Sequence, residues 1–118
     1  MSEAPPGDAA SIDFVLALGR ALHRYGTPAL RLEEALGVVC RQIGLDAEVF
    51  STPTTLIMSF GAPAELRTRM MRVDDGELDL AKLAQVDALA DAVAARKVSI
   101  EEGSRRLAAI VAAPRTYD

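Results

Sequence analysis

The fold is decided by the stretch Val49-Phe50-Ser51-Thr52-Pro53-Thr54-Thr55-Leu56-Ile57-Met58-Ser59-Phe60. β-Branched and aromatic residues, which favour strands, are concentrated here in a chain that is otherwise rich in Ala and Leu. Pro53 has no backbone N–H to donate to a neighbouring strand, so it marks a bend between two strands at residues 47–52 and 54–60. The stretch therefore predicts the centre of a small sheet.

A third strand is expected directly after these two. Residues 66–73 alternate between polar and apolar side chains, and they lie between the turns Gly61-Ala62-Pro63-Ala64 and Asp74-Asp75-Gly76-Glu77. Three consecutive strands joined by short turns form an antiparallel meander. Its apolar face needs a layer of helices over it.

Two helices are predicted before the sheet. Ser11 is a candidate N-cap of the first helix, which Gly26 ends. Thr27-Pro28 would begin the second helix as N-cap and first-turn proline, and Gly44 would end it. Residues 1–10, rich in Pro, Gly and Ala, are expected to form a disordered leader.

Two more helices are predicted after the sheet. Asp79 is a candidate N-cap of the third helix, and Ser99 with Glu102 forms a capping box at the start of the fourth, which Pro114 ends. The element order is therefore ααβββαα. This order predicts an α+β fold in which a three-stranded antiparallel meander packs against helices, with residues 11–118 as one domain.

Composition narrows the possible functions. The chain has 118 residues, a net charge of −4, no Trp, three Phe and two Tyr, which argues against a nucleic-acid partner. Cys40 is the single cysteine and His23 the single histidine, so a disulfide within the chain is impossible and a metal site or other cofactor is not expected. The N-terminus lacks the features of a signal peptide, and no apolar run approaches the roughly 20 residues that span a bilayer. We expect a soluble, cytoplasmic chain.

Thr52 and Thr54 at the bend are candidate ligand-binding residues. Their hydroxyl groups, with free backbone groups beside Pro53, could hold the ammonium, carboxylate or hydroxyl group of a small amino acid. Threonine is also a common strand and turn residue, and on residue chemistry alone this structural role is favoured.

Arg31 and Glu33 lie in the first turns of the second predicted helix. Because helix N-termini attract anions, Arg31 could bind a carboxylate there. The alternative is an exposed pair between Arg31 and Glu34, which would contribute little to stability.

Arg72 is the third-strand arginine for which a partner is expected. Strand alternation places it on the face of Thr68 and Met70, opposite to Arg67 and Arg69. We expect this face to be buried, so that Arg72 needs an acidic partner. The two candidates are Glu33 and Glu48.

Lys82 falls in the first turn of the third helix, where the helix dipole disfavours a cation. This position suggests an acidic partner such as Asp79, or a carboxylate across a domain interface, with a solvated lysine as the alternative. His23, between Arg20 and Arg24, is expected on a solvated face, and Cys40 in the core.

Several of these segments resemble one known family. The runs Gly26-Thr27-Pro28-Ala29-Leu30-Arg31-Leu32-Glu33-Glu34-Ala35-Leu36 and Glu48-Val49-Phe50-Ser51-Thr52-Pro53-Thr54 are similar to motifs of the threonine/serine exporter family. So are Arg72-Val73 followed by Leu80-Ala81-Lys82-Leu83, and the helix that begins at Val98-Ser99-Ile100-Glu101-Glu102-Gly103. Together they cover about residues 13–117 in the family's order and spacing.

The resemblance implies a non-catalytic cytoplasmic domain or subunit of a bacterial-type amino-acid exporter. Its partner would be a multi-span membrane domain or subunit, it would require no cofactor, and it would act in gating, assembly or the sensing of threonine or serine. Six candidate residues are motif positions of the resemblance, and they are expected to bind a ligand or to form an interface: Arg31, Glu33, Thr52, Thr54, Arg72 and Lys82.

Two alternatives come from other classes of protein. A small hydrolase-type enzyme would need a nucleophile, such as Ser51, Thr54 or Cys40, within hydrogen-bond reach of His23 or of a carboxylate. A free-standing small-molecule-binding homodimer would use the sheet edge or the second helix as its interface.

Overall fold

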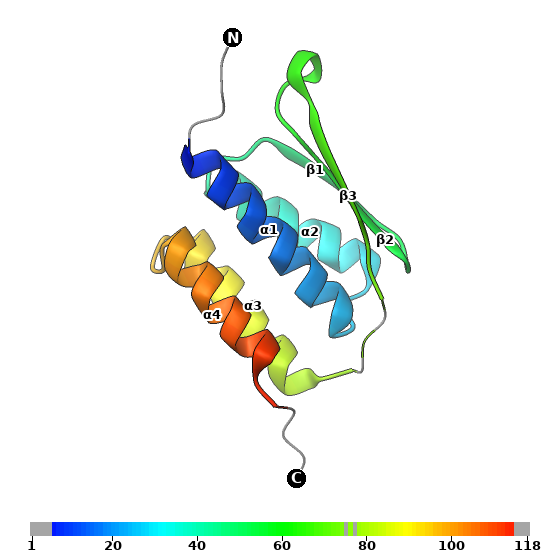
Figure 1. Cartoon of the computed structure of the whole chain (residues 1–118), viewed down its shortest axis with the longest axis vertical. Coiled ribbons are helices and arrows are strands. Elements are labelled where there is room, and N and C mark those ends of the chain that lie inside the picture. The colour runs from blue at the N-terminus through cyan, green and yellow to red at the C-terminus, as the bar shows by residue number, and fades with distance from the viewer. Residues whose placement is uncertain (1–5, 75, 77, 115–118) are drawn as a thin grey trace.

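A computed structural model describes residues 6–74, 76 and 78–114 of the chain. The helices in this part are α1 (Pro6–Arg24), α2 (Ala29–Gln42), α3 (Leu80–Ala94) and α4 (Ile100–Ala112). The strands β1 (Ala47–Ser51), β2 (Thr55–Phe60) and β3 (Arg67–Arg72) lie between α2 and α3, and the short 3₁₀ helix η1 (Pro63–Glu65) precedes β3. This order confirms the predicted ααβββαα arrangement and the α+β class (Figure 1).

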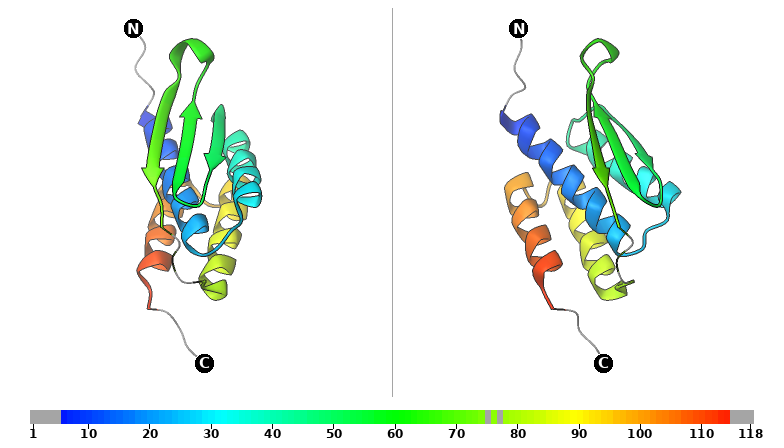
Figure 2. Two further views of the ribbon diagram at one scale, coloured as in Figure 1. Left: turned by 90° about the vertical axis from the view of Figure 1, so that its right-hand side faces the viewer. Right: turned by 45° about the vertical axis from the view of Figure 1, so that its right-hand side comes forward.

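The elements form three layers. One face of the sheet packs on α2 and α1, and the pair α3 and α4 packs on the other side of these two helices (Figure 2). The strand order is β1-β2-β3 and both pairs are antiparallel, as the predicted meander requires. Helix α1 is the central element, because it contacts β2, α2, α3 and α4.

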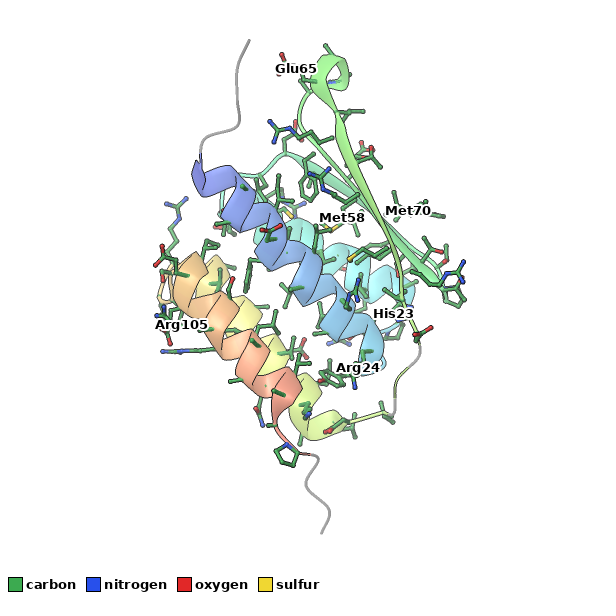
Figure 3. All side chains as sticks on the ribbon, viewed as in Figure 1. His23, Arg24, Met58, Glu65, Met70 and Arg105 are labelled. Atoms are coloured by element: carbon green, nitrogen blue, oxygen red, sulfur yellow. The ribbon has the colours of Figure 1, made fainter. Side chains whose placement is uncertain are left out.

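The two faces of the sheet differ in burial. Leu56, Met58 and Phe60 of β2 point toward the helices and are buried. Residues on the opposite face belong to all three strands and alternate with these inward residues: Glu48, Phe50, Thr55, Ile57, Ser59, Thr68, Met70 and Arg72. We call this the outer sheet face. Figure 3 labels Met58 between the sheet and the helices and Met70 on the outer side.

Arg72 shares the face of Thr68 and Met70, as predicted, but this face is exposed and not buried as expected. The register pairs Arg72 with Thr55 and Met71 with Leu56, so it is Met71 that faces the helices while Arg72 is exposed. The prediction was wrong because strand alternation separates two faces without saying which one is covered.

Helix α1 is buried on two sides. A β-carbon on Gly103 of α4 would lie 3.1 Å from Phe14 of α1, which shows close contact between these two helices. On the side of the sheet, a β-carbon on Gly19 would lie 2.6 Å from Leu56 and 2.9 Å from Leu36. The absence of a side chain at Gly19 thus lets α1 approach both β2 and α2.

The start of α1 differs from the prediction. The helix begins at Pro6, and Ser11 is a buried residue within it, so residues 6–10 are not a disordered leader. Proline is favoured at the first position of a helix, where no backbone N–H is needed. Residues 1–5 lie outside the described part of the chain.

Three of the predicted helix starts are at or next to the N-caps of the structure. Asp79 accepts a hydrogen bond from the backbone N–H of Lys82 at 3.0 Å, and the Ser99 hydroxyl accepts one from Glu102 at 3.1 Å, so both predicted caps are confirmed. The carboxylate of Glu102 binds Arg105 and Arg106, which lowers its pKa. At α2 the N-cap is Pro28 in an extended conformation rather than Thr27.

Candidate functional site

The bend Thr52-Pro53-Thr54-Thr55 joins β1 to β2 and is held by Thr52. The Thr52 backbone N–H donates to the Thr55 carbonyl at 2.8 Å. The Thr52 hydroxyl accepts hydrogen bonds from the backbone N–H groups of Thr55 at 2.9 Å and Thr54 at 3.3 Å. Thr52 therefore has the structural role that turn chemistry favours, and Thr54 is exposed beside it.

Both N-terminal helices contact this bend. Glu33 of α2 accepts a hydrogen bond from the backbone N–H of Ser51 through Oε2 at 2.9 Å. Nε2 of His23, on α1, lies 3.1 Å from the carbonyl oxygen of Thr52. Because a carbonyl only accepts, Nε2 carries the proton and donates it. We define the bend site as His23, Glu33, Ser51, Thr52 and Thr54.

His23 is not on a solvated face, as its arginine neighbours suggested. Its exposed fraction is 7 %, and it lies near the C-terminal end of α1 (Figure 3). It continues a second buried line on α1, formed at helical spacing by Ile12, Val15 and Gly19. This spacing was the available signal, and it was missed because glycine and histidine are not apolar side chains.

Two buried polar atoms of the bend site have no hydrogen-bond partner among the described residues, namely His23 Nδ1 and Ser51 Oγ. Tyr25 and Thr27, in the link between α1 and α2, each have a buried hydroxyl group that also has no hydrogen-bond partner among the described residues. Nδ1 is an acceptor in this tautomer, and a hydroxyl group can donate or accept. Both atoms of the bend site keep unused hydrogen-bonding capacity, but they are closed to solvent, so an ammonium or hydroxyl group would reach them only after a local rearrangement.

The bend site lacks the geometry of a hydrolase. Within the described residues, no hydrogen bond joins His23 to the side chain of Ser51, Thr54 or Cys40. Burial raises the pKa of the Cys40 thiol to about 11, so it stays protonated near neutral pH and is a poor nucleophile. The same residues contain no cluster of three side chains suited to a metal ion.

Lys82 closes the C-terminal end of α4. Its Nζ donates hydrogen bonds to the carbonyl oxygens of Val111, at 3.1 Å, and Ala113, and it lies 5.8 Å from the centre of the Tyr25 ring. A cation is favoured at the carbonyl end of a helix. The partners of the ammonium group are thus carbonyl groups at the end of α4 and not Asp79, whereas a carboxylate across a domain interface stays a prediction.

Arg31 lies away from the bend site. Positions two apart on a helix differ by about 200° in direction, so Arg31 and Glu33 point to opposite sides of α2. Arg31 lines a groove of about 550 Å³ between α2 and α3, together with Glu34 and Asp91. It forms no ion pair with a described residue.

Arg72 is placed near the bend but not within it. Its cross-strand neighbour is Thr55, and it forms no ion pair with Glu33, Glu48 or another described residue. The structure therefore brings together Glu33, Thr52 and Thr54 of the six predicted residues. Arg72 instead lines a second cavity, of about 700 Å³, between α1 and α4.

Comparison with known proteins identifies relatives of the chain. Residues 13–118 match the family described as "Putative threonine/serine exporter". The "Pheromone-regulated membrane protein 10" of Saccharomyces cerevisiae (strain YJM789) is 36% identical over 107 residues, which are 88% of this chain and 14% of the relative. The protein of the same name from Eremothecium gossypii is 31% identical over 106 residues, again 88% of this chain and 14% of the relative. No solved structure matches the chain.

These relatives are several times longer than the chain, and their names describe membrane proteins. Among the residues that the structure describes, none of the helices is both long and apolar enough to cross a bilayer. Both relatives are fungal, so the bacterial type expected for the system stays a prediction. The matched region, residues 13–118, covers the four quoted motifs. The chain belongs to the threonine/serine exporter family, and this membership supports a transport-related role.

Proposed function

We propose that the chain is a non-catalytic, cytoplasmic part of a threonine/serine exporter system and that it assembles with the membrane part or gates it. It would work at the inner face of the plasma membrane. The transport-related role of the family supports this proposal. So does the small share of the membrane-protein relatives, 14%, that the chain spans, since most of their length is available for other functions.

The outer sheet face is the observation that carries the proposal. No helix of the described residues covers it, and its central row runs across all three strands from Phe50 through Ile57 to Met70. The exposed fractions of Phe50 and Met70 are 58% and 72%. Adjacent apolar side chains left in contact with water favour association with a partner. Glu48 and Arg72 flank this row and would orient that partner.

A charge placed in this row is expected to reduce transport. In cells that express the whole exporter, Met70→Glu should lower threonine and serine efflux severalfold, because a carboxylate would be desolvated in the interface. Met70 is exposed, so the variant should fold. Efflux from cells preloaded with threonine measures the effect.

Leu66→Glu is the matched control. Leu66 has an exposed fraction of 53%. It lies between η1 and β3, outside the row. Its substitution should leave efflux unchanged. Equal efflux from the Met70→Glu variant and the unchanged exporter would overturn the assembly role of the outer sheet face.

Amino-acid sensing is the finer part of the proposal, and the bend site supports it. His23 Nδ1 and Ser51 Oγ suit the ammonium and hydroxyl groups of threonine or serine. Calorimetric titration of the chain with threonine is expected to give saturable heat, and Ser51→Ala should reduce it. Ser59→Ala is the control, because the Ser59 hydroxyl is already hydrogen-bonded to that of Thr68, at 3.0 Å on the outer sheet face. No heat at millimolar threonine would remove sensing and leave assembly or gating.

A further inference from the structure

The cavity between α1 and α4 has an apolar floor. Its volume of about 700 Å³ lies within the range of small-molecule sites. The floor is formed mainly by small and aliphatic side chains on the facing sides of the two helices: Ala17, Ala21, Leu107, Ala108 and Val111. The α4 lining runs from Ser104 to Ala112, which is about 12 Å at the rise of an α-helix. This floor suits an aliphatic group of medium length.

Arg20 and Arg24 of α1 line the same cavity, and Arg72 borders it at the end of the edge strand β3. Asp74 is the acidic residue among the described lining residues. Arg20 donates a weak hydrogen bond to the sulfur of Met71 at 3.4 Å, and the guanidinium of Arg24 lies 5.9 Å from the centre of the Tyr25 ring. None of the three arginines forms an ion pair with a residue that the structure describes. The cavity thus concentrates positive charge in a chain whose net charge is −4.

Val73, Asp74 and Gly76, after β3, also line the cavity, and Gly76 lies against the end of α1. A β-carbon on Gly76 would lie 2.8 Å from the carbonyl oxygen of Arg24 and 2.6 Å from its Cγ, so this segment lies directly on the end of α1. Such contact is possible because glycine has no side chain. It brings Gly76 against the helix that carries Arg20 and Arg24.

We propose that this cavity binds an anionic amphiphile, with a phosphate monoester or carboxylate at the arginines and an aliphatic chain along the floor. Guanidinium groups bind such anions through paired, charge-assisted hydrogen bonds. Free threonine fits this site poorly, because its carboxylate carries a neighbouring ammonium group that the arginines repel, and its side chain leaves most of the floor empty. The site shares no residue with the bend site, and its test does not depend on amino-acid sensing.

Calorimetric titration with decyl phosphate, below its micelle concentration, tests the proposal. Decyl phosphate should bind at least about tenfold more tightly than decanol, which lacks the anion, and than inorganic phosphate, which lacks the chain. Arg24→Gln should weaken binding by about tenfold, since one charge-assisted contact is lost. Arg67→Gln is the matched control, because Arg67 is an exposed arginine that does not line the cavity.

A second variant tests the floor separately. Ala108 is exposed on α4 and lines the cavity, so Ala108→Trp should fill the floor without unfolding the helix and should abolish binding of decyl phosphate. Circular dichroism checks that the helices remain. Decanol binding as tightly as decyl phosphate, equal affinities of the Arg24→Gln and Arg67→Gln variants, or normal binding by Ala108→Trp would each overturn the proposal.

The source of the anion is distinguished by vesicles that contain lysophosphatidic acid in phosphatidylcholine. If the chain sediments with these vesicles and Ala108→Trp abolishes this sedimentation, the result would support binding of a membrane lipid in the cavity. Binding of free decyl phosphate without sedimentation would support a soluble ligand. Sedimentation that Ala108→Trp leaves unchanged, without binding of free decyl phosphate, would contradict the site.

Discussion

Replacing Gly19 by alanine is expected to lower the free energy of unfolding by about 2 to 3 kcal/mol. The added methyl group would lie 2.6 Å from Cδ2 of Leu56 and 2.9 Å from Cδ1 of Leu36, both of which are fully buried. Because neither leucine can move freely in a packed core, α1 must shift away from β2 and α2. Urea unfolding followed by circular dichroism measures the change.

Gly37→Ala is the control for the intrinsic preference of a helix for alanine. Gly37 is also inside a helix, α2, but a β-carbon there would meet only the flexible end of Arg41, at 3.4 Å. This substitution should therefore raise the free energy of unfolding by about 0.5–1 kcal/mol. If the two substitutions change stability in the same direction, the close approach at Gly19 does not limit packing.

Replacing Glu33 by alanine is expected to lower the free energy of unfolding by about 2 kcal/mol. The carboxylate of Glu33 accepts the hydrogen bond of the Ser51 backbone N–H at 2.9 Å, and Ser51 is buried. Without Glu33 the Ser51 N–H loses its acceptor. The Ser51 hydroxyl group has no hydrogen-bond partner among the described residues either. An unpaired buried donor keeps its full desolvation cost.

Glu34→Ala and Glu33→Gln separate the possible causes of such a loss. Glu34 is the exposed neighbour on α2, and its substitution should change stability by less than about 0.5 kcal/mol. Glu33→Gln keeps an acceptor oxygen without the charge and should recover part of the stability. A loss at Glu34 equal to that at Glu33 would show that helix propensity or net charge, rather than the bond to Ser51, is responsible.

Local signals in the sequence were sufficient for most of the fold. The residues around Pro53 predicted two strands and their bend, and Asp79 and Ser99 predicted two helix starts within one residue. Each of these signals depends on neighbours a few residues apart, so it can be recognised without the tertiary structure. Pro6 shows where this approach was insufficient, since the first helix extends through a segment whose composition suggested disorder.

The candidate site was predicted less completely, because its contacts join distant segments. The bend was recognised through Thr52, but its bonds to Glu33 and His23 depend on how α1 and α2 pack on the sheet. Lys82 binds carbonyl groups that lie 29 and 31 residues later in the chain. The arginine-lined cavity combines α1, α4 and the segment after β3, and no spacing within one element indicates such a cavity.

The central position of α1 places residues of both proposed sites on one helix. His23 contacts the bend, and the next residue, Arg24, lines the cavity on another side of the same last turn. A shift of this turn would therefore move both side chains together. Where binding at one site shifts the turn, thermodynamic linkage requires that affinity at the other site changes by the same factor.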